Sequence, residues 1–136
     1  MNLSIGQTYN YDFKFSQTDV VAFANVTGDK NPVHLDEAFA AKSIFKRRIM
    51  HGMLSASVFS KVFGTLFPGE GTIYLKQSLA FLKPMYVDTD YVAGFTVKEI
   101  IKDKNRAVVE TIVKQKTTSI VCISGIATIM NIMLIK

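Results

Sequence analysis

The stretch from residue 53 to residue 66 is the feature that most limits how this chain can fold. A helix over these residues would present apolar side chains in nearly every direction. Such a helix cannot face water, so it must be buried, and a sheet wrapped around it would supply the cover. Pro68-Gly69 ends the segment. Its apolar members are Met53, Leu54, Ala56, Val58, Phe59, Val62, Phe63 and Leu66.

The segments on either side of this helix predict an α+β fold with an antiparallel sheet. Before it, residues 8–15 alternate aromatic and polar side chains, as in a strand. Two short helices are then expected, the first with a capping box at Ser16 and Asp19 and a stop at Gly28, the second N-capped by Asp36. After the long helix come four predicted strands, over residues 73–81, where Gln77 breaks the alternation, 91–101, 106–116 and 118–130.

Length and composition bound the class of protein. The 136 residues, 49% apolar and 20% charged, are expected to form one globular domain over residues 1–136. The start of the chain lacks the pattern of a secretory signal, and the most apolar tract, residues 119–135, is predicted to be a buried strand rather than a membrane span. The single cysteine, Cys122, is interpreted as a buried structural thiol. We therefore expect a cytoplasmic protein.

The net charge of +5 favours acidic partners, such as coenzyme A or an acidic carrier protein. Basic residues cluster at Lys46, Arg47 and Arg48, which either contact the phosphates of coenzyme A or form a solvated loop. No aromatic-interleaved basic stripe accompanies this cluster, so nucleic acid is not an expected partner.

Residues 28–36, Gly-Asp-Lys-Asn-Pro-Val-His-Leu-Asp, carry the clearest chemical signal. Asp29 and His34 lie five residues apart in a segment predicted to be a loop. A carboxylate and an imidazole, whose pKa values burial can tune, suit acid–base work on a water molecule. Each residue taken alone has a structural explanation, Asp29 as a turn residue and His34 as a hydrogen-bonded loop histidine. The sequence suggests no metal cluster or nucleophile triad.

These residues fall in a longer pattern that resembles the MaoC-like, (R)-specific enoyl-CoA hydratases of the hot-dog superfamily. The resemblance covers roughly residues 19–125. It is carried by Phe23, Thr27-Gly28-Asp29, Asn31-Pro32, His34, Asp36, Phe39-Ala40, Phe45, Ile49, His51-Gly52, Leu54 and Phe81-Leu82-Lys83-Pro84. The sequence departs from the family pattern at residues 85–90, which lack the Gly-Asp pair common after that proline.

The resemblance implies a hot-dog fold, in which a curved antiparallel sheet encloses a long central helix and subunits pair into a homodimer. It also implies that Asp29 and His34 form the catalytic pair and that Gly52 donates its backbone N–H to the thioester oxygen. Gly52 opens the long helix, where unpaired N–H groups would stabilise an oxyanion, although close packing would also require glycine there.

Three further residues are candidates for supporting roles. We expect His51 to orient the loop or cap the helix rather than to act as acid or base. Asn31 either ties the loop together or touches the catalytic water, with the structural role favoured because Asn before Pro often starts a turn. Ser60 either faces the active site or bonds back to its own helix.

The predicted function is hydration of trans-2-enoyl-CoA to (R)-3-hydroxyacyl-CoA, and its reversal, by a hydro-lyase that needs no metal and no cofactor beyond the coenzyme A of its substrate. A 3-hydroxyacyl dehydratase acting on acyl carrier protein is the alternative enzyme. A non-catalytic acyl-thioester-binding subunit is a third hypothesis, disfavoured because both Asp29 and His34 are present. A thioesterase is disfavoured because that class does not usually carry the Asp-x-Asn-Pro-x-His loop. Acyl chain length, cellular direction and the group that first takes the water proton are left open.

Overall fold

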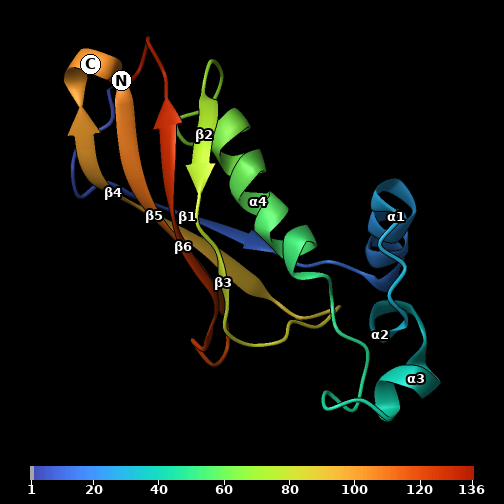
Figure 1. The fold of residues 1–136 in the computed structure, drawn as a ribbon. Helices are drawn as coiled ribbons and strands as arrows, with labels where there is room; N and C mark the ends of the chain where they lie inside the picture. Colours follow the sequence, from blue (N-terminus) through green and yellow to red (C-terminus); the bar gives the residue numbers. More distant parts are fainter. Residues whose placement is uncertain (1) are drawn as a thin grey trace.

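The computed structural model describes residues 2–136 and confirms the predicted α+β class. One strand and three short helices precede the long helix, and the remaining strands follow it (Figure 1). The elements are β1 (Thr8–Phe13), α1 (Gln17–Thr27), α2 (Pro32–Leu35), α3 (Glu37–Ala41), α4 (Gly52–Thr65), β2 (Ile73–Gln77), β3 (Ala80–Phe81), β4 (Tyr91–Ile101), a 3-10 turn (Lys102–Lys104), β5 (Arg106–Gln115) and β6 (Val121–Met130).

Within the described residues, six antiparallel strands form one sheet in the order β1-β4-β5-β6-β2, with β3 also paired to β6. The central hairpin pairs β4 with β5 from Tyr91 opposite Gln115 to Ile101 opposite Arg106. Its turn is closed by Asn105, which adopts a left-handed conformation with φ of +52°. Both termini lie at the same end of this sheet (Figure 1).

The stretch predicted as one strand over residues 73–81 is divided between β2 and β3. The register against β6 shifts between Tyr74 and Lys76, which is a β-bulge. Because a bulge inserts one extra residue, it accounts for the broken alternation at Gln77 in the sequence.

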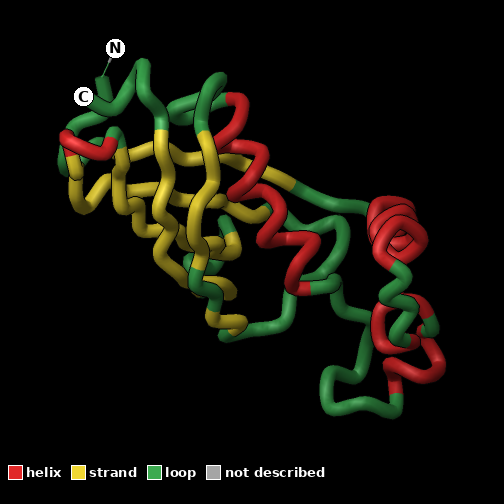
Figure 2. Tube along the Cα trace, turned by 45° about the horizontal axis from the view of Figure 1, so that its top comes forward, coloured by secondary structure: helices red, strands yellow, loops and turns green. Residues whose placement is uncertain are grey.

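Helix α4 lies against the sheet and supplies the centre of the core (Figures 1 and 2). The rings of Phe59 and Phe63 pack edge-on against Phe95 of β4, with centroids 5.7 and 5.3 Å away. Burial of each such ring contributes roughly 1.5–3 kcal/mol. The cover is one-sided, because Met53, Ser57 and other residues of the opposite face remain exposed in this chain.

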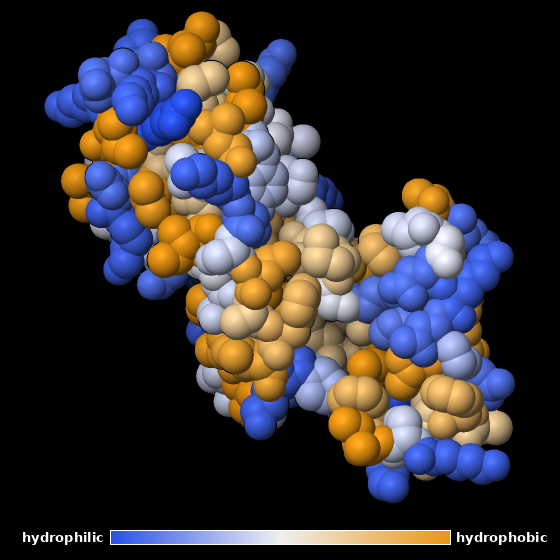
Figure 3. Space-filling model, viewed as in Figure 1, coloured by the Kyte–Doolittle hydropathy of each residue, from blue (hydrophilic) through white to orange (hydrophobic). Residues whose placement is uncertain are grey.

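Helices α1, α2 and α3 gather beyond the start of α4, and we call residues 17–41 the helical arm (Figure 2). In the space-filling view a notch separates the arm from the body formed by the sheet and α4 (Figure 3). The helix ends predicted from the sequence are confirmed here. Ser16 and Asp19 form the capping box of α1, Gly28 ends α1 with φ of +78°, and the Asp36 side chain caps α3.

The segment predicted as a loop over residues 29–34 differs in one respect. Pro32–Leu35 forms a single helical turn, α2, so His34 projects from a helix and not from a loop. Proline is favoured at the first position of a helix, which explains why Asn31-Pro32 starts one. Asn31 itself is extended, as expected for a residue before proline, and its side chain accepts a hydrogen bond from the Val33 N–H.

Cys122 is buried, as predicted, and burial raises the pKa of its thiol. Among the described residues, none of the helices is both long enough and apolar enough to span a membrane.

Candidate active site

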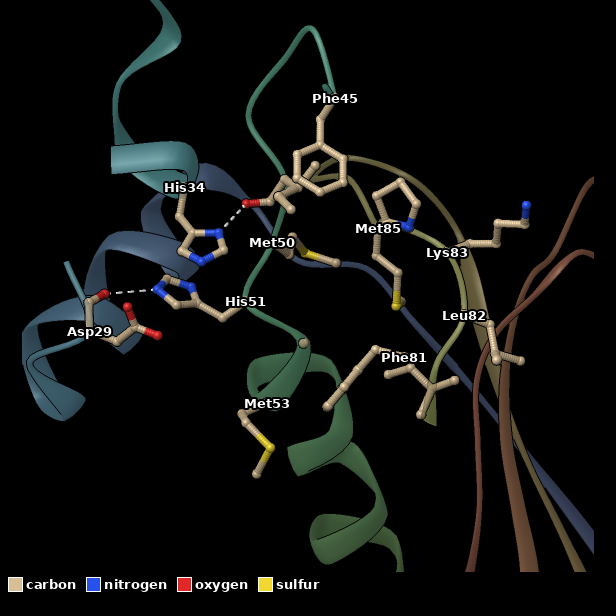
Figure 4. Close-up of a pocket in the computed structure, with 14 residues that line it drawn as sticks. Asp29, His34, Phe45, Met50, His51, Met53, Phe81, Leu82, Lys83 and Met85 are labelled. Carbon is tan, nitrogen blue, oxygen red and sulfur yellow. Dashed lines mark hydrogen bonds between the residues drawn. The ribbon is translucent and has the colours of Figure 1, made fainter. Parts of the chain in front are cut away.

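The Asp29 segment is fixed by hydrogen bonds within its own loop. The Asp29 N–H donates to the Thr27 hydroxyl (3.2 Å), and the Asp29 carboxylate accepts from the Asn31 N–H (3.3 Å). Since Asn31 uses its own side-chain oxygen to start α2, the structure supports a structural role for Asn31. The Asp29 side chain is exposed in this chain and stands beside the two histidines (Figure 4).

His34 is 8% exposed and is held in one orientation by the backbone. Its Nδ1 lies 2.8 Å from the Ile49 carbonyl oxygen, so this nitrogen carries a proton and donates it. The neutral ring then has a free lone pair on Nε2. Burial lowers the pKa of His34 most strongly, the Ile49 carbonyl raises it, the nearby His51 lowers it, and Asp29 raises it, with a net lowering from 6.5.

His51 contacts both members of the predicted pair. Its ring stacks on the His34 ring with centroids 3.8 Å apart, and its Nε2 donates to the Asp29 carbonyl oxygen at 2.9 Å (Figure 4). Phe23 of α1 packs against the same ring at 4.9 Å. The predicted role in orienting the loop is therefore supported. His51 also occupies the N-cap position of α4, where its side chain makes no capping hydrogen bond within the described residues.

Gly52 is the first residue of α4, where backbone N–H groups have no partner within the helix. A Cβ at Gly52 would lie 2.6 Å from two ring carbons of Phe81, a residue of β3. A side chain at this position would therefore require the Phe81 ring to move, so the present packing favours glycine.

A cavity of about 380 Å³ brings Asp29, His34, His51 and Gly52 together. We call it the Asp29–His34 cavity, and the rest of its wall is mostly apolar (Figure 4). Its other lining residues are Phe45, Ile49, Met50, Met53, Phe81, Leu82, Lys83, Pro84, Met85 and Ile123. The predicted acid–base pair and the predicted oxyanion donor thus share one wall.

The predicted basic cluster lies elsewhere. Arg47 stacks over the Tyr86 ring at 3.4 Å, and Arg48 forms an ion pair with Glu37 at 3.8 Å. Lys46 is exposed and has a left-handed backbone with φ of +66°. The cation on the cavity wall is instead Lys83, which sequence reasoning missed as a site residue. The signal was present, because Lys83 belongs to the Phe81-Leu82-Lys83-Pro84 motif.

A second cavity, of about 780 Å³, runs between the exposed face of α4 and β2. We call it the α4–β2 groove. It contains Ser60, which the sequence offered as a supporting residue, and it shares Asp29 and Met53 with the Asp29–His34 cavity. Ser60 and His34 therefore lie on different cavities that meet at Asp29. The remaining lining residues are Phe23, Thr27, Ala56, Ser57, Tyr74, Leu75, Lys76, Gln77 and Leu79.

Asp29, His34 and His51 also form a possible metal-ligand set, since one ligand atom from each lies within 4.8 Å of the others. The two imidazole rings, however, are stacked with an interplanar angle of 30°. In-plane lone pairs of stacked rings run nearly parallel, whereas a shared ion needs lone pairs that converge. The arrangement is better suited to moving a proton than to holding a metal.

The fold and the site together define a class of protein: an antiparallel sheet against one long helix, with an Asp/His pair set beside the helix N-terminus. The family model for the MaoC like domain matches residues 2–119. The chain belongs to the MaoC-like family of hot-dog proteins.

Individual relatives agree with this assignment. An (R)-specific enoyl-CoA hydratase of Aeromonas caviae is 44% identical over 110 residues, which is 81% of this chain and 82% of the relative. The solved (R)-hydratase of A. caviae involved in PHA biosynthesis superposes with a TM-score of 0.90 at 39% identity, covering 95% of this chain and 97% of that one. A mitochondrial 3-hydroxyacyl-[acyl-carrier-protein] dehydratase of Arabidopsis thaliana is 33% identical over 93% of this chain and 76% of the relative.

These findings confirm the predicted family, the hot-dog fold and, with the family, the predicted class of enzyme, a hydro-lyase.

Proposed function

We propose that this chain adds water to trans-2-enoyl-CoA to give (R)-3-hydroxyacyl-CoA and catalyses the reverse reaction. One observation carries the proposal: Asp29, His34 and the N-terminus of α4 at Gly52 line the same cavity. The (R)-specific enoyl-CoA hydratase of A. caviae, at 44% identity, supports both the reaction and its stereochemistry.

His34 is the proposed base. Its Nδ1 is committed to the Ile49 carbonyl, and its lowered pKa keeps the ring neutral at pH 7, so Nε2 can accept a proton from water. As the proton moves to Nε2, the water oxygen forms a bond to C3 of the enoyl group. The Asp29 carboxylate orients the water and stabilises the imidazolium that forms.

The electrons of the C2–C3 double bond move onto the thioester oxygen. The N–H of Gly52, together with the positive potential at the start of α4, stabilises this enolate. The proton held by His34 then returns to C2 as the carbonyl reforms. One water molecule is added overall, and both catalytic groups regain their starting states.

Lys83 on the cavity wall is the proposed contact for a phosphate or polar group of the carrier, with Lys46, Arg47 and Arg48 as the wider basic surface. Acyl carrier protein is the alternative carrier, favoured by the Arabidopsis thaliana relative and by the net charge of +5. Rates on matched CoA and carrier-protein thioesters discriminate between the two. A protein carrier makes KM rise steeply with salt, because it depends on charge attraction across a large surface.

We also propose a cytoplasmic homodimer. Strand β2 is at the edge of the sheet and exposes Ile73 and Leu75, and an exposed apolar edge strand favours pairing with a second copy. Sedimentation of the purified chain tests this assembly.

The primary test follows loss of the conjugated-enoyl absorbance when the protein is mixed with crotonyl-CoA. Wild type is expected to be active, and Asp29→Asn and His34→Ala to lose about two to four orders of magnitude in kcat, as expected for loss of an acid–base group. Activity in EDTA is expected to equal that without it. A folded wild type that is inactive on CoA thioesters, on carrier-protein thioesters and on longer chains would contradict the proposal.

A further inference from the structure

The α4–β2 groove opens directly from the catalytic carboxylate, since Asp29 and Met53 line both it and the Asp29–His34 cavity. Beyond them the apolar part of its lining comes from three elements: Phe23 of α1, Ala56 of α4 and Leu75 of β2. Thr27, Ser57, Ser60 and Lys76 add polar groups. On the proposed function, C3 of the substrate lies at Asp29, so the groove is placed to receive the carbons beyond C3.

The bulge in β2 determines which side chains of this strand face inward at the groove. In a regular strand, residues three apart point to opposite faces. The register shift between Tyr74 and Lys76 moves this alternation by one residue. Tyr74 and Gln77 are accordingly both half-buried, while Leu75 and Lys76 between them are exposed. Their side chains are hydrogen-bonded to each other, Tyr74 hydroxyl to Gln77 Oε1.

This pair is anchored from behind. The Gln77 amide nitrogen donates to the buried Thr111 hydroxyl (2.9 Å) and to the Ser78 carbonyl (2.7 Å), and Thr111 donates to the Gly125 carbonyl (3.1 Å). The Tyr74 ring packs edge-on against Phe63 at 5.2 Å. A ring held by the core and a hydrogen-bonded amide cannot swing aside easily to admit a longer ligand.

Gly125 makes this arrangement possible. A Cβ there would lie 1.8 Å from the Ser78 carbonyl oxygen, so only glycine in β6 lets the chain between β2 and β3 pass this close. That close passage is what carries Gln77 against Thr111.

The polar atoms of the pair are already satisfied. Both amide hydrogens of Gln77 are donated to protein groups, its oxygen accepts from Tyr74, and burial raises the pKa of Tyr74 to about 12, which keeps the phenol neutral. A polar group placed against these two side chains would therefore find no free partner on them, whereas the end of an alkyl chain needs none.

We propose that the bulge-set Tyr74–Gln77 pair is the end wall of the acyl site and limits the length of the acyl chain that this groove accepts. This inference rests on the proposed function and adds to it the residues that select the acyl chain length.

The test measures kcat/KM for crotonyl-CoA and its longer straight-chain homologues with wild type, Tyr74→Val and Tyr74→Phe. Tyr74→Val removes the ring and makes room for further methylenes. For the shortest homologue that wild type rejects, its kcat/KM relative to that of crotonyl-CoA should rise by roughly tenfold or more. Tyr74→Phe keeps the ring and should shift that ratio by less than about twofold.

Tyr11→Val is the matched control. Tyr11 is also a half-buried tyrosine in a strand, with its hydroxyl bonded to Lys61, and it lies outside both cavities. It should leave the chain-length profile as in wild type. If Tyr74→Val is too unstable to assay, Tyr74→Trp provides the opposite test, since a larger ring should shorten the longest acyl chain that the enzyme accepts.

A folded, active Tyr74→Val with the wild-type profile would overturn the inference while leaving the proposed function intact, and so would an unchanged profile in Tyr74→Trp. A wild type that hydrates no enoyl thioester would instead remove the proposed function, on which the inference depends.

Discussion

Long ladders of backbone hydrogen bonds hold the body of the molecule together, whereas single contacts hold the helical arm. In the body, β4 and β5 pair along their whole length and α4 covers them with aromatic rings. The arm has helices of 11, 4 and 5 residues, and helices this short are not stable by themselves. Most of the stabilising contacts therefore lie in the body, whereas Asp29 and His34 lie in the helical arm.

The contacts between arm and body are few and lie close to the site. The Ile49 carbonyl accepts from His34, the Ile49 N–H donates to the Val33 carbonyl (3.3 Å), and His51 donates to the Asp29 carbonyl. The two proposed catalytic side chains are therefore carried by the less stable region and set against Gly52 of the more stable one. Activity should depend on these contacts more than global stability does.

The largest expected effect is a loss of stability when a buried ring is removed from the body, compared with removal of a ring from the arm. Phe59→Ala removes a fully buried ring that packs on Phe95, and should lower the free energy of unfolding by about 3–5 kcal/mol. Phe39→Ala is the matched change in the arm, where the ring is 50% exposed, and should cost less than about 1 kcal/mol. Urea unfolding measures both, and equal losses would refute the contrast.

The features that the sequence predicted are those set by neighbouring residues. The capping box of α1, the stop at Gly28 and the β4–β5 hairpin each depend on side chains within a few positions, so they could be read without knowing the fold. The pairing of Asp29 with His34 was likewise predictable, because both residues belong to one short motif.

The features that escaped prediction join segments far apart in the chain. The stacking of His51 on His34, the contact of Phe81 with Gly52 and the position of Lys83 on the cavity wall all depend on how the arm, α4 and β3 meet. Local patterns carry no information on such distances, so they identify the basic run at residues 46–48 but not the position of Lys83 on the cavity wall. Gln77 signalled an irregularity, but only the register against β6 identifies it as a bulge.

The next expected effect tests the junction between arm and body with the same substitution at two positions of α4. Gly52→Ala places a Cβ 2.6 Å from Phe81 ring atoms and disturbs the proposed oxyanion donor, so kcat should fall about two to three orders of magnitude. Gly64→Ala meets no heavy atom within 4 Å among the described residues and should stabilise the helix by about 0.5–1 kcal/mol with activity retained.

Steady-state hydration rates and thermal unfolding of the two glycine variants show whether Gly52 is an oxyanion site or a packing position. If Gly52→Ala keeps wild-type kcat, the start of α4 is a packing position and not an oxyanion site. If it loses activity together with its cooperative unfolding transition, the loss reflects misfolding, and a substrate-analogue affinity measured on the folded fraction would be needed to assign it.

The smallest expected effect concerns pH and the contact between the two histidines. The pKa of His34 is lowered from 6.5, mainly by burial, so the neutral ring is stable to lower pH in the folded protein than in the unfolded chain. Its contribution to stability is present above pH 6.5 and is lost as pH falls through the folded pKa. The proposed base is lost over the same range, and kcat/KM should have an acid limb with a midpoint below 6.5.

His51→Gln sharpens this pH test, because glutamine can still donate to the Asp29 carbonyl while the imidazole ring beside His34 is removed. The nearby His51 lowers the pKa of His34, so its removal should move the acid limb of kcat/KM toward higher pH, with a fold similar to wild type. The chain has only these two histidines, so no third one obscures the profile. An acid limb above 6.5 in wild type, or one that moves to lower pH in His51→Gln, would mean that His34 is not the group whose neutral form takes the water proton.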